Sequence, residues 1–90
     1  MTSGEETAIG ILTWLAGEPE LLGRFLALTG TDPSSLRNAA SDPGFLAGVT
    51  DFLMGHEPTL LAFCEATGTR PEQVVKAHAA LSGSQEGFDF

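Results

Sequence analysis

The feature of this sequence that most limits its possible folds is a repeat with a period of about 38 residues. Around Gly17 and again around Gly55, the chain has an aromatic residue, a leucine, a glycine, a Glu-Pro pair and two leucines in the same order. In this comparison, His56 is an added residue of the second copy. The matches that follow are Phe25 with Phe63, Thr29-Gly30-Thr31 with Thr67-Gly68-Thr69, Pro33 with Pro71, and Ala39 with Ala77. Because solenoids generally need three or more repeats, we expect the two halves, at about 5–41 and 42–81, to share one core.

Both halves contain apolar residues at helical spacing, separated by residues that begin or end helices. Gly17, Gly30 and Gly68 are typical of helix ends. Thr69 and Glu72 have the spacing of a capping box, in which each side chain accepts a hydrogen bond from the other residue's backbone N–H. The predicted fold is all-α: a compact bundle of about six short helices formed by two similar three-helix halves.

Length and composition are consistent with one folded domain. The chain has 90 residues, of which 42% are apolar and 18% charged, unlike the polar, highly charged composition of disordered chains. We expect a single helical domain over residues 1–83. Residues 84–90 show no helical periodicity and are predicted to form a flexible C-terminal tail.

The charge of the chain argues against several classes of partner. Its formal net charge is −8, and its four basic residues are scattered, whereas nucleic acids and anionic membranes are bound by clustered Lys and Arg side chains. We therefore expect no nucleic acid and no membrane as partner. Residues 60–81 could be interpreted as a helix-turn-helix, but Glu72 and the negative net charge make DNA binding the less favoured alternative.

The beginning of the sequence and its longest apolar stretch bear on location. The chain starts Met-Thr-Ser-Gly-Glu-Glu, without the basic start and apolar run of a secretory signal. The longest apolar stretch, at about residues 8–16, is much shorter than the roughly 20 residues that cross a bilayer. A cytoplasmic location is therefore expected.

Few side chains in the sequence suggest a catalytic or metal-binding role. His56 and His78 could bind a metal, but their spacing is not that of a helical histidine pair, so no metal site is predicted. Their potential co-ligands are Glu57, Glu65 and Cys64. Cys64, the only cysteine, lies in an apolar helical pattern and is interpreted as a small buried residue. We recognise neither a catalytic Ser-His-acid arrangement nor a phosphate loop, so we expect no enzyme activity, no catalytic residues and no cofactor.

Several segments resemble a bacterial domain-of-unknown-function family of small all-helical proteins. They are Gly23 to Gly30 (Gly-Arg-Phe-Leu-Ala-Leu-Thr-Gly), Asp32-Pro33 and Leu60 to Phe63, within a resemblance that covers roughly residues 5–83. It implies a helical fold and no assigned activity, substrate or cofactor. The second half is also weakly similar to a ubiquitin-associated-type three-helix module, whose Met-Gly-aromatic loop forms part of a docking patch. Here His56 follows Met54-Gly55 in place of the aromatic residue.

The function that fits these observations is a non-catalytic protein–protein interaction module with an apolar groove between its halves, rimmed by negative charge. The partner would be an unidentified protein or a second copy of the chain. The candidate patch residues are Trp14, Leu22, Phe25, Phe52, Met54, Phe88 and Phe90. The competing interpretation is that these residues belong to the core. The rival function, a small-molecule binder or enzyme subunit, predicts an enclosed pocket containing His56, Glu57 or His78.

Overall fold

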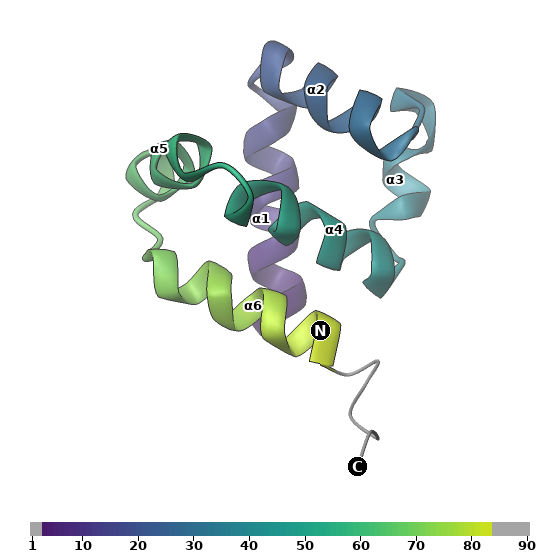
Figure 1. Ribbon diagram of the computed structural model, residues 1–90. Coiled ribbons are helices and arrows are strands. Elements are labelled where there is room, and N and C mark those ends of the chain that lie inside the picture. Colours follow the sequence, from purple (N-terminus) through teal and green to yellow (C-terminus); the bar gives the residue numbers. More distant parts are fainter. Residues whose placement is uncertain (1–2, 84–90) are drawn as a thin grey trace.

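The computed structural model describes residues 3–83, which form six α-helices and one 3₁₀ turn without a β-strand in that range (Figure 1). This confirms the predicted all-α bundle. The predicted tail, residues 84–90, lies outside the described residues. In chain order the elements are α1 (Ser3–Ala16), α2 (Pro19–Thr29), η1 (Pro33–Ser35), α3 (Leu36–Ala39), α4 (Pro43–Met54), α5 (Glu57–Thr67) and α6 (Pro71–Gly83).

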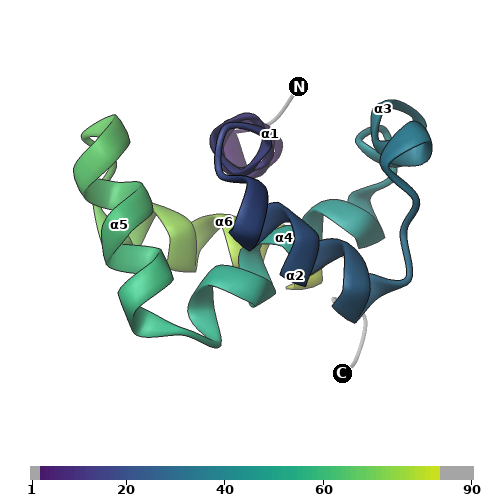
Figure 2. The ribbon, with the colours of Figure 1, turned by 90° about the horizontal axis from the view of Figure 1, so that it is seen from above.

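Three of these helices, α1, α4 and α6, pack most extensively against one another and form the centre of the molecule. In Figure 1, α4 crosses in front of α1, and α6 lies below α4 and crosses the lower end of α1. The view from above in Figure 2 places α5 and α3 on opposite sides of α1. The first helix of each half, α1 or α4, is therefore central, whereas the second helix, α2 or α5, lies towards the edge.

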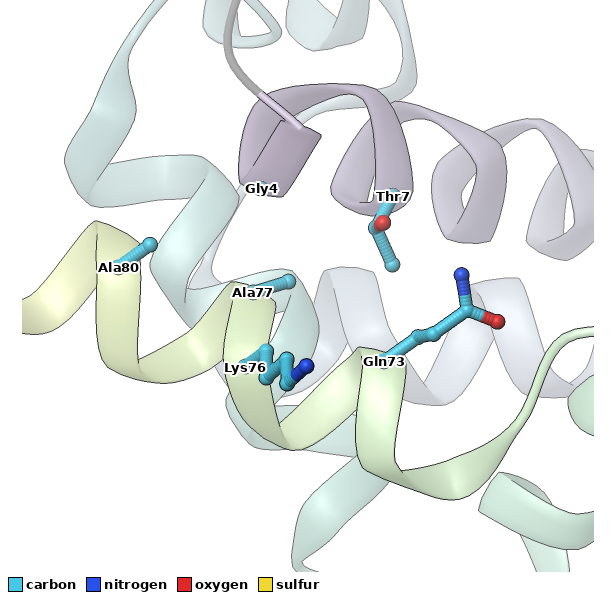
Figure 3. A pocket seen from close by; sticks show the side chains of 6 residues that line it. All are labelled: Gly4, Thr7, Gln73, Lys76, Ala77 and Ala80. Atoms are coloured by element: carbon cyan, nitrogen blue, oxygen red, sulfur yellow. The ribbon is translucent and has the colours of Figure 1, made fainter.

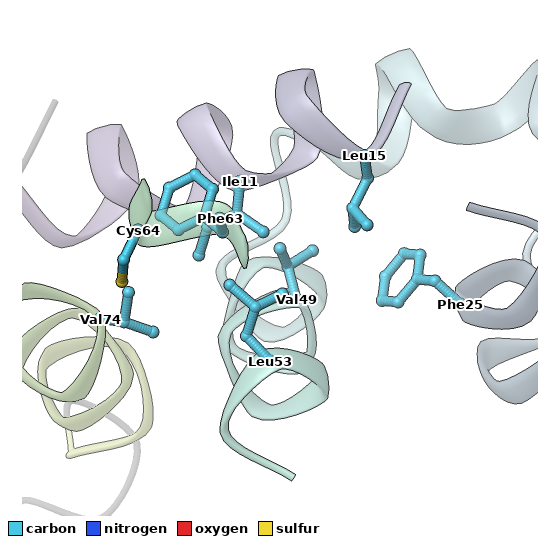
Figure 4. Close-up of a cluster of buried hydrophobic side chains, with 8 residues drawn as sticks. All are labelled: Ile11, Leu15, Phe25, Val49, Leu53, Phe63, Cys64 and Val74. Carbon is cyan, nitrogen blue, oxygen red and sulfur yellow. The ribbon is translucent and has the colours of Figure 1, made fainter. Parts of the chain in front are cut away.

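The main hydrophobic core joins all five long helices (Figure 4). Its members, each with at most 8% of its surface exposed, are Ile11, Leu15, Phe25, Val49, Leu53, Phe63, Cys64 and Val74. A smaller cluster of Ala8, Leu46 and Leu81 joins α1, α4 and α6. Because full burial of a large apolar side chain contributes about 1.5–3 kcal/mol, these two clusters supply most of the stabilisation that holds the helices together.

The structure repeats with an interval of 38 residues without an insertion. Helices α2 and α5 each have 11 residues, and α5 begins at Glu57, 38 positions after Pro19. The core pairs at the same interval are Ile11 with Val49, Leu15 with Leu53, and Phe25 with Phe63. His56 precedes α5 as its N-cap residue, just as Glu18 precedes α2, so the interpretation of His56 as an added residue was wrong. The Glu-Pro pair lies one residue later in the second half than in the first, and this shift made His56 look like an added residue. The shift is possible because the first turn of a helix tolerates proline at more than one position.

The C-terminal ends of α2 and α5 have the same local geometry. Gly30 and Gly68 adopt left-handed conformations, with φ, ψ of 70°, 17° and 73°, 18°. In each helix the threonine before the glycine donates its hydroxyl to the carbonyl of the core phenylalanine four residues earlier, at 3.0 Å for Thr29 and 2.8 Å for Thr67. The repeated Thr-Gly-Thr sequence therefore encodes a repeated helix end.

The third helix differs between the two halves. Helix α6 has 13 residues, whereas the corresponding segment of the first half is a 3₁₀ turn followed by the four-residue α3. The reason is that α4 begins at Pro43, with the Asp42 side chain accepting a hydrogen bond from the Gly44 N–H at 2.9 Å. This early start shortens the segment available for the third helix of the first half.

The N-terminus of α6 uses a different side chain from the one predicted. The Arg70 N–H donates to the Gln73 side-chain oxygen at 3.0 Å. Because α6 begins at Pro71, its third residue is Gln73, so the residue that reaches back to the cap is Gln73 and not Glu72. The predicted capping box of Thr69 and Glu72 was therefore displaced by one residue.

Candidate functional site

The candidate patch residues have different environments. Phe25 is fully buried, so placing it in an exposed patch was wrong: its ring lies in the core, edge-on to Phe45 and Phe52. Trp14, Leu22 and Phe52 are half-buried and pack against the core cluster. Met54 is exposed. The remaining two candidates, Phe88 and Phe90, lie outside the described residues.

Two aromatic pairs join the halves in equivalent ways. Phe25 on α2 lies edge-on to Phe52 on α4, with ring centroids 5.3 Å apart and an interplanar angle of 66°. Phe63 on α5 has the same relation to Trp14 on α1, at 5.5 Å and 66°. The second helix of each half therefore packs on the first helix of the other half, and the molecule has two equivalent junctions, α2–α4 and α5–α1.

A cleft of about 360 Å³ lies along the α2–α4 junction, and a smaller one of about 220 Å³ adjoins it. Leu28, with 71% of its surface exposed, lines both. The larger cleft is lined by Arg24, Leu28, Asp51, Phe52, Gly55 and His56, and we name it the Leu28 groove. Phe52, one of the candidate patch residues, lines this groove, whereas Leu28, its most exposed apolar side chain, was not among them.

The α5–α1 junction has a different chemical character at the corresponding positions. Counted at the interval of 38 residues, Leu28 corresponds to Ala66 and Arg24 to Ala62. On the other helix of the junction, the counterparts are Thr13 for Asp51 and Glu18 for His56. The same type of junction thus forms with small or neutral side chains at three of these four positions. The exposed leucine, the arginine and the aspartate of the Leu28 groove are therefore not required by the fold.

His78 lies beside Asp51, which lines the Leu28 groove. The Nε2 atom of His78 is 3.5 Å from Asp51 Oδ1 and also 3.5 Å from Ser82 Oγ. A Ser-His-Asp relay needs the hydroxyl and the carboxylate on opposite ring nitrogens, whereas here both contact the same nitrogen. His56, the other histidine, is turned towards its own helix, with Nδ1 2.7 Å from Thr59 Oγ1. Neither histidine is in a catalytic relay in this geometry.

Metal-binding side chains do not converge in residues 3–83: no three His, Cys, Asp or Glu side chains there are placed to hold an ion. Cys64 lies in the main core cluster, and its burial raises the pKa of its thiol. The prediction that Cys64 is a buried core residue is therefore confirmed.

We expect Cys64 to react slowly with thiol reagents while the protein is folded. Burial restricts access to the sulfur, and the raised pKa lowers the fraction of reactive thiolate at neutral pH. The rate with an aromatic disulfide reagent should be at least about tenfold lower in buffer than in denaturant, at the same pH. Equal rates in the two conditions would mean that the sulfur is accessible in the folded protein.

A further cleft, of about 380 Å³, lies between α1 and α6 (Figure 3). It is lined by Gly4, Thr7, Gln73, Lys76, Ala77 and Ala80. A Cβ added to Gly4 would lie 3.3 Å from the Cβ of Ala80, so the two helices approach closely because both residues are small. The lining contains no carboxylate, histidine or cysteine, and we interpret this cleft as a consequence of close helix packing.

Comparison with known proteins gives one result. A sequence model of a family described as "Protein of unknown function (DUF3572)" matches residues 2–84. No curated protein and no solved structure matches the chain. The similarity of the second half to a ubiquitin-associated-type module has no support in these comparisons. Within residues 3–83, no helix combines the length and the apolar character needed to cross a membrane.

Proposed function

The chain belongs to the DUF3572 family of proteins of unknown function, and since that family supplies no activity, we propose from the surface of the molecule that it is a non-catalytic protein–protein interaction module. Its partner protein binds in the Leu28 groove. The observation that carries this proposal is the difference between the two equivalent junctions, because only the α2–α4 junction carries an exposed leucine, an arginine and an aspartate.

The residues of the groove have the character of an interface centre. The apolar side chain of Leu28 is exposed to solvent, and the half-buried ring of Phe52 lines the same groove. Arg24 and Asp51 supply charged groups at the edge of this apolar surface. A few such residues usually carry most of the binding energy, while the surrounding contacts exclude water. We therefore infer that the Leu28 groove is the centre of a larger contact area.

The rival function, a small-molecule binder or enzyme subunit, has less support from the geometry. It requires an enclosed pocket that contains His56, Glu57 or His78. His56 lines the Leu28 groove, which is open to solvent, and neither Glu57 nor His78 lines it with His56. An open groove with an apolar ridge suits a protein surface better than it suits a small ligand.

Affinity capture from the native cell lysate tests the proposal. The full chain is compared with Leu28→Ala and, as a matched control, Leu61→Ala, which removes an exposed leucine outside the groove. Alanine is the residue that the second half has at the position of Leu28, so the first variant should fold normally. We expect a partner that the full chain and Leu61→Ala retain and that Leu28→Ala loses. Equal capture by all three proteins would contradict binding through the groove.

A further inference from the structure

A second exposed apolar surface lies where α5 meets the start of α6, at the left of Figure 1. It contains a cleft of about 570 Å³ lined by Pro58, Leu61, Ala62, Cys64, Glu65 and Pro71. Leu61 is 49% exposed, and Val75, one helical turn after Pro71, is 48% exposed. We name Pro58, Leu61, Ala62, Pro71 and Val75 the α5–α6 face. This surface goes beyond the proposed function, because the Leu28 groove shares no residue with it.

The fold does not need an apolar side chain at the position of Leu61. Its counterpart in the equivalent helix α2 is Gly23, which is exposed and whose added Cβ would meet nothing within 4 Å. The counterpart of Ala62 is Arg24. Helices α2 and α5 have the same length and the same type of C-terminal end despite these differences. A leucine at this position is therefore specific to the α5–α6 face and is not needed to form this kind of helix.

One carboxylate lines the cleft of the α5–α6 face, and two more belong to residues adjacent to its prolines in the sequence. Glu65 lines the cleft, and Glu57 and Glu72 directly precede and follow the lining prolines in the sequence. The nearby cation Arg70 is 3.9 Å from Glu72 and offsets one of these three negative charges, so a net negative charge remains among the four residues. Because the chain has a net charge of −8, a binding partner approaches an apolar surface that lies in a negative electrostatic potential.

We propose that the α5–α6 face binds a positively charged amphipathic helix of another protein. Apolar side chains spaced three and four residues apart lie against Leu61 and Val75, as in other helix-in-groove contacts. Lysine or arginine side chains on the flanks of that helix lie beside these carboxylates. A second copy of this chain is the poorer occupant, because it would bring more carboxylates next to these and would double the net negative charge.

A titration of the full chain with a synthetic peptide, followed by NMR, tests this proposal. The probe is a helical peptide of about 18 residues made of leucine and lysine, with all leucines on one face. The control peptide has the same composition with leucines spread around the helix. We expect the probe to shift signals of α5 and of the first turns of α6, and to bind roughly tenfold more weakly to Leu61→Ala. Affinity should fall as salt is added, because the carboxylates attract the peptide's lysines.

Two further variants separate binding from folding. Leu28→Ala, the matched control, should bind the probe as the full chain does. Glu65→Gln keeps the shape of the side chain and should weaken binding while leaving the melting temperature unchanged. Equal affinity of Leu61→Ala and the full chain, equal binding of the control peptide, or absence of binding would overturn the proposal. Shifts confined to the Leu28 groove would also overturn it while supporting the proposed function. Concentration-dependent shifts of the α5–α6 face without peptide would overturn it in favour of a second copy.

Discussion

Replacement of Phe25 by alanine is expected to lower the free energy of unfolding by about 3–5 kcal/mol. The ring is fully buried and contacts two other rings, with centroid distances of 5.6 Å to Phe45 and 5.3 Å to Phe52. Its removal leaves a cavity at the junction of α2 and α4, the contact that fixes α2 to the other half. Because small domains have total stabilities of about 5–15 kcal/mol, a large part of the stability would be lost. Urea unfolding followed by circular dichroism measures this change.

The matched control for this substitution is Leu28→Ala, one helical turn later on the same helix. Among the exposed large apolar side chains of residues 3–83, that of Leu28 is the most exposed. Its removal should therefore change the free energy of unfolding by no more than about 0.5 kcal/mol. A similar loss of stability for both variants would contradict the orientation of α2. The expected result, one large loss and one negligible one, would also show that Leu28 contributes little to the core.

The repeat and the helix-end residues made much of the fold predictable. Regular apolar spacing predicted helices, and Gly30 and Gly68 were predicted to end two of them, as the structure confirms. These features depend on residues close together in the sequence, whose effect on the backbone is local. The short α3 was also predictable, because the helix-start residues Asp42-Pro43 follow it closely.

The location of the groove residues was less predictable because it depends on how the two halves pack. Helix α2 has apolar residues around most of its circumference, so periodicity alone could not decide whether Phe25 or Leu28 faces the core. The contact with Phe52, from the other half, decides it. The interval of 38 residues contains a signal that could have helped: Phe25 corresponds to another phenylalanine, Phe63, whereas Leu28 corresponds to Ala66. A large residue kept in both halves indicates the core, and an unmatched one indicates the surface.

The same repeat leads to a second prediction with a large effect, at the two left-handed glycines. Gly30→Ala and Gly68→Ala should each lower the free energy of unfolding by about 1–2 kcal/mol, because a Cβ is unfavourable in the left-handed conformation. The two φ values are 70° and 73°, and in neither case would the added Cβ meet another atom within 4 Å. The loss therefore comes from the backbone conformation alone and should be nearly equal at both sites. Thermal and urea unfolding of the two variants measure it.

Gly10→Ala is the matched control, because it makes the same substitution inside helix α1, where an added Cβ also meets nothing within 4 Å. Here φ is not in the left-handed region, so alanine should raise the free energy of unfolding by about 0.5–1 kcal/mol through its higher helix propensity. Opposite signs at Gly10 and at the two helix ends would establish that backbone conformation, and not loss of space, fixes glycine at the ends of α2 and α5. If Gly30→Ala and Gly68→Ala differed by more than about 1 kcal/mol, the two helix ends would not be equivalent in energy, despite their equal geometry.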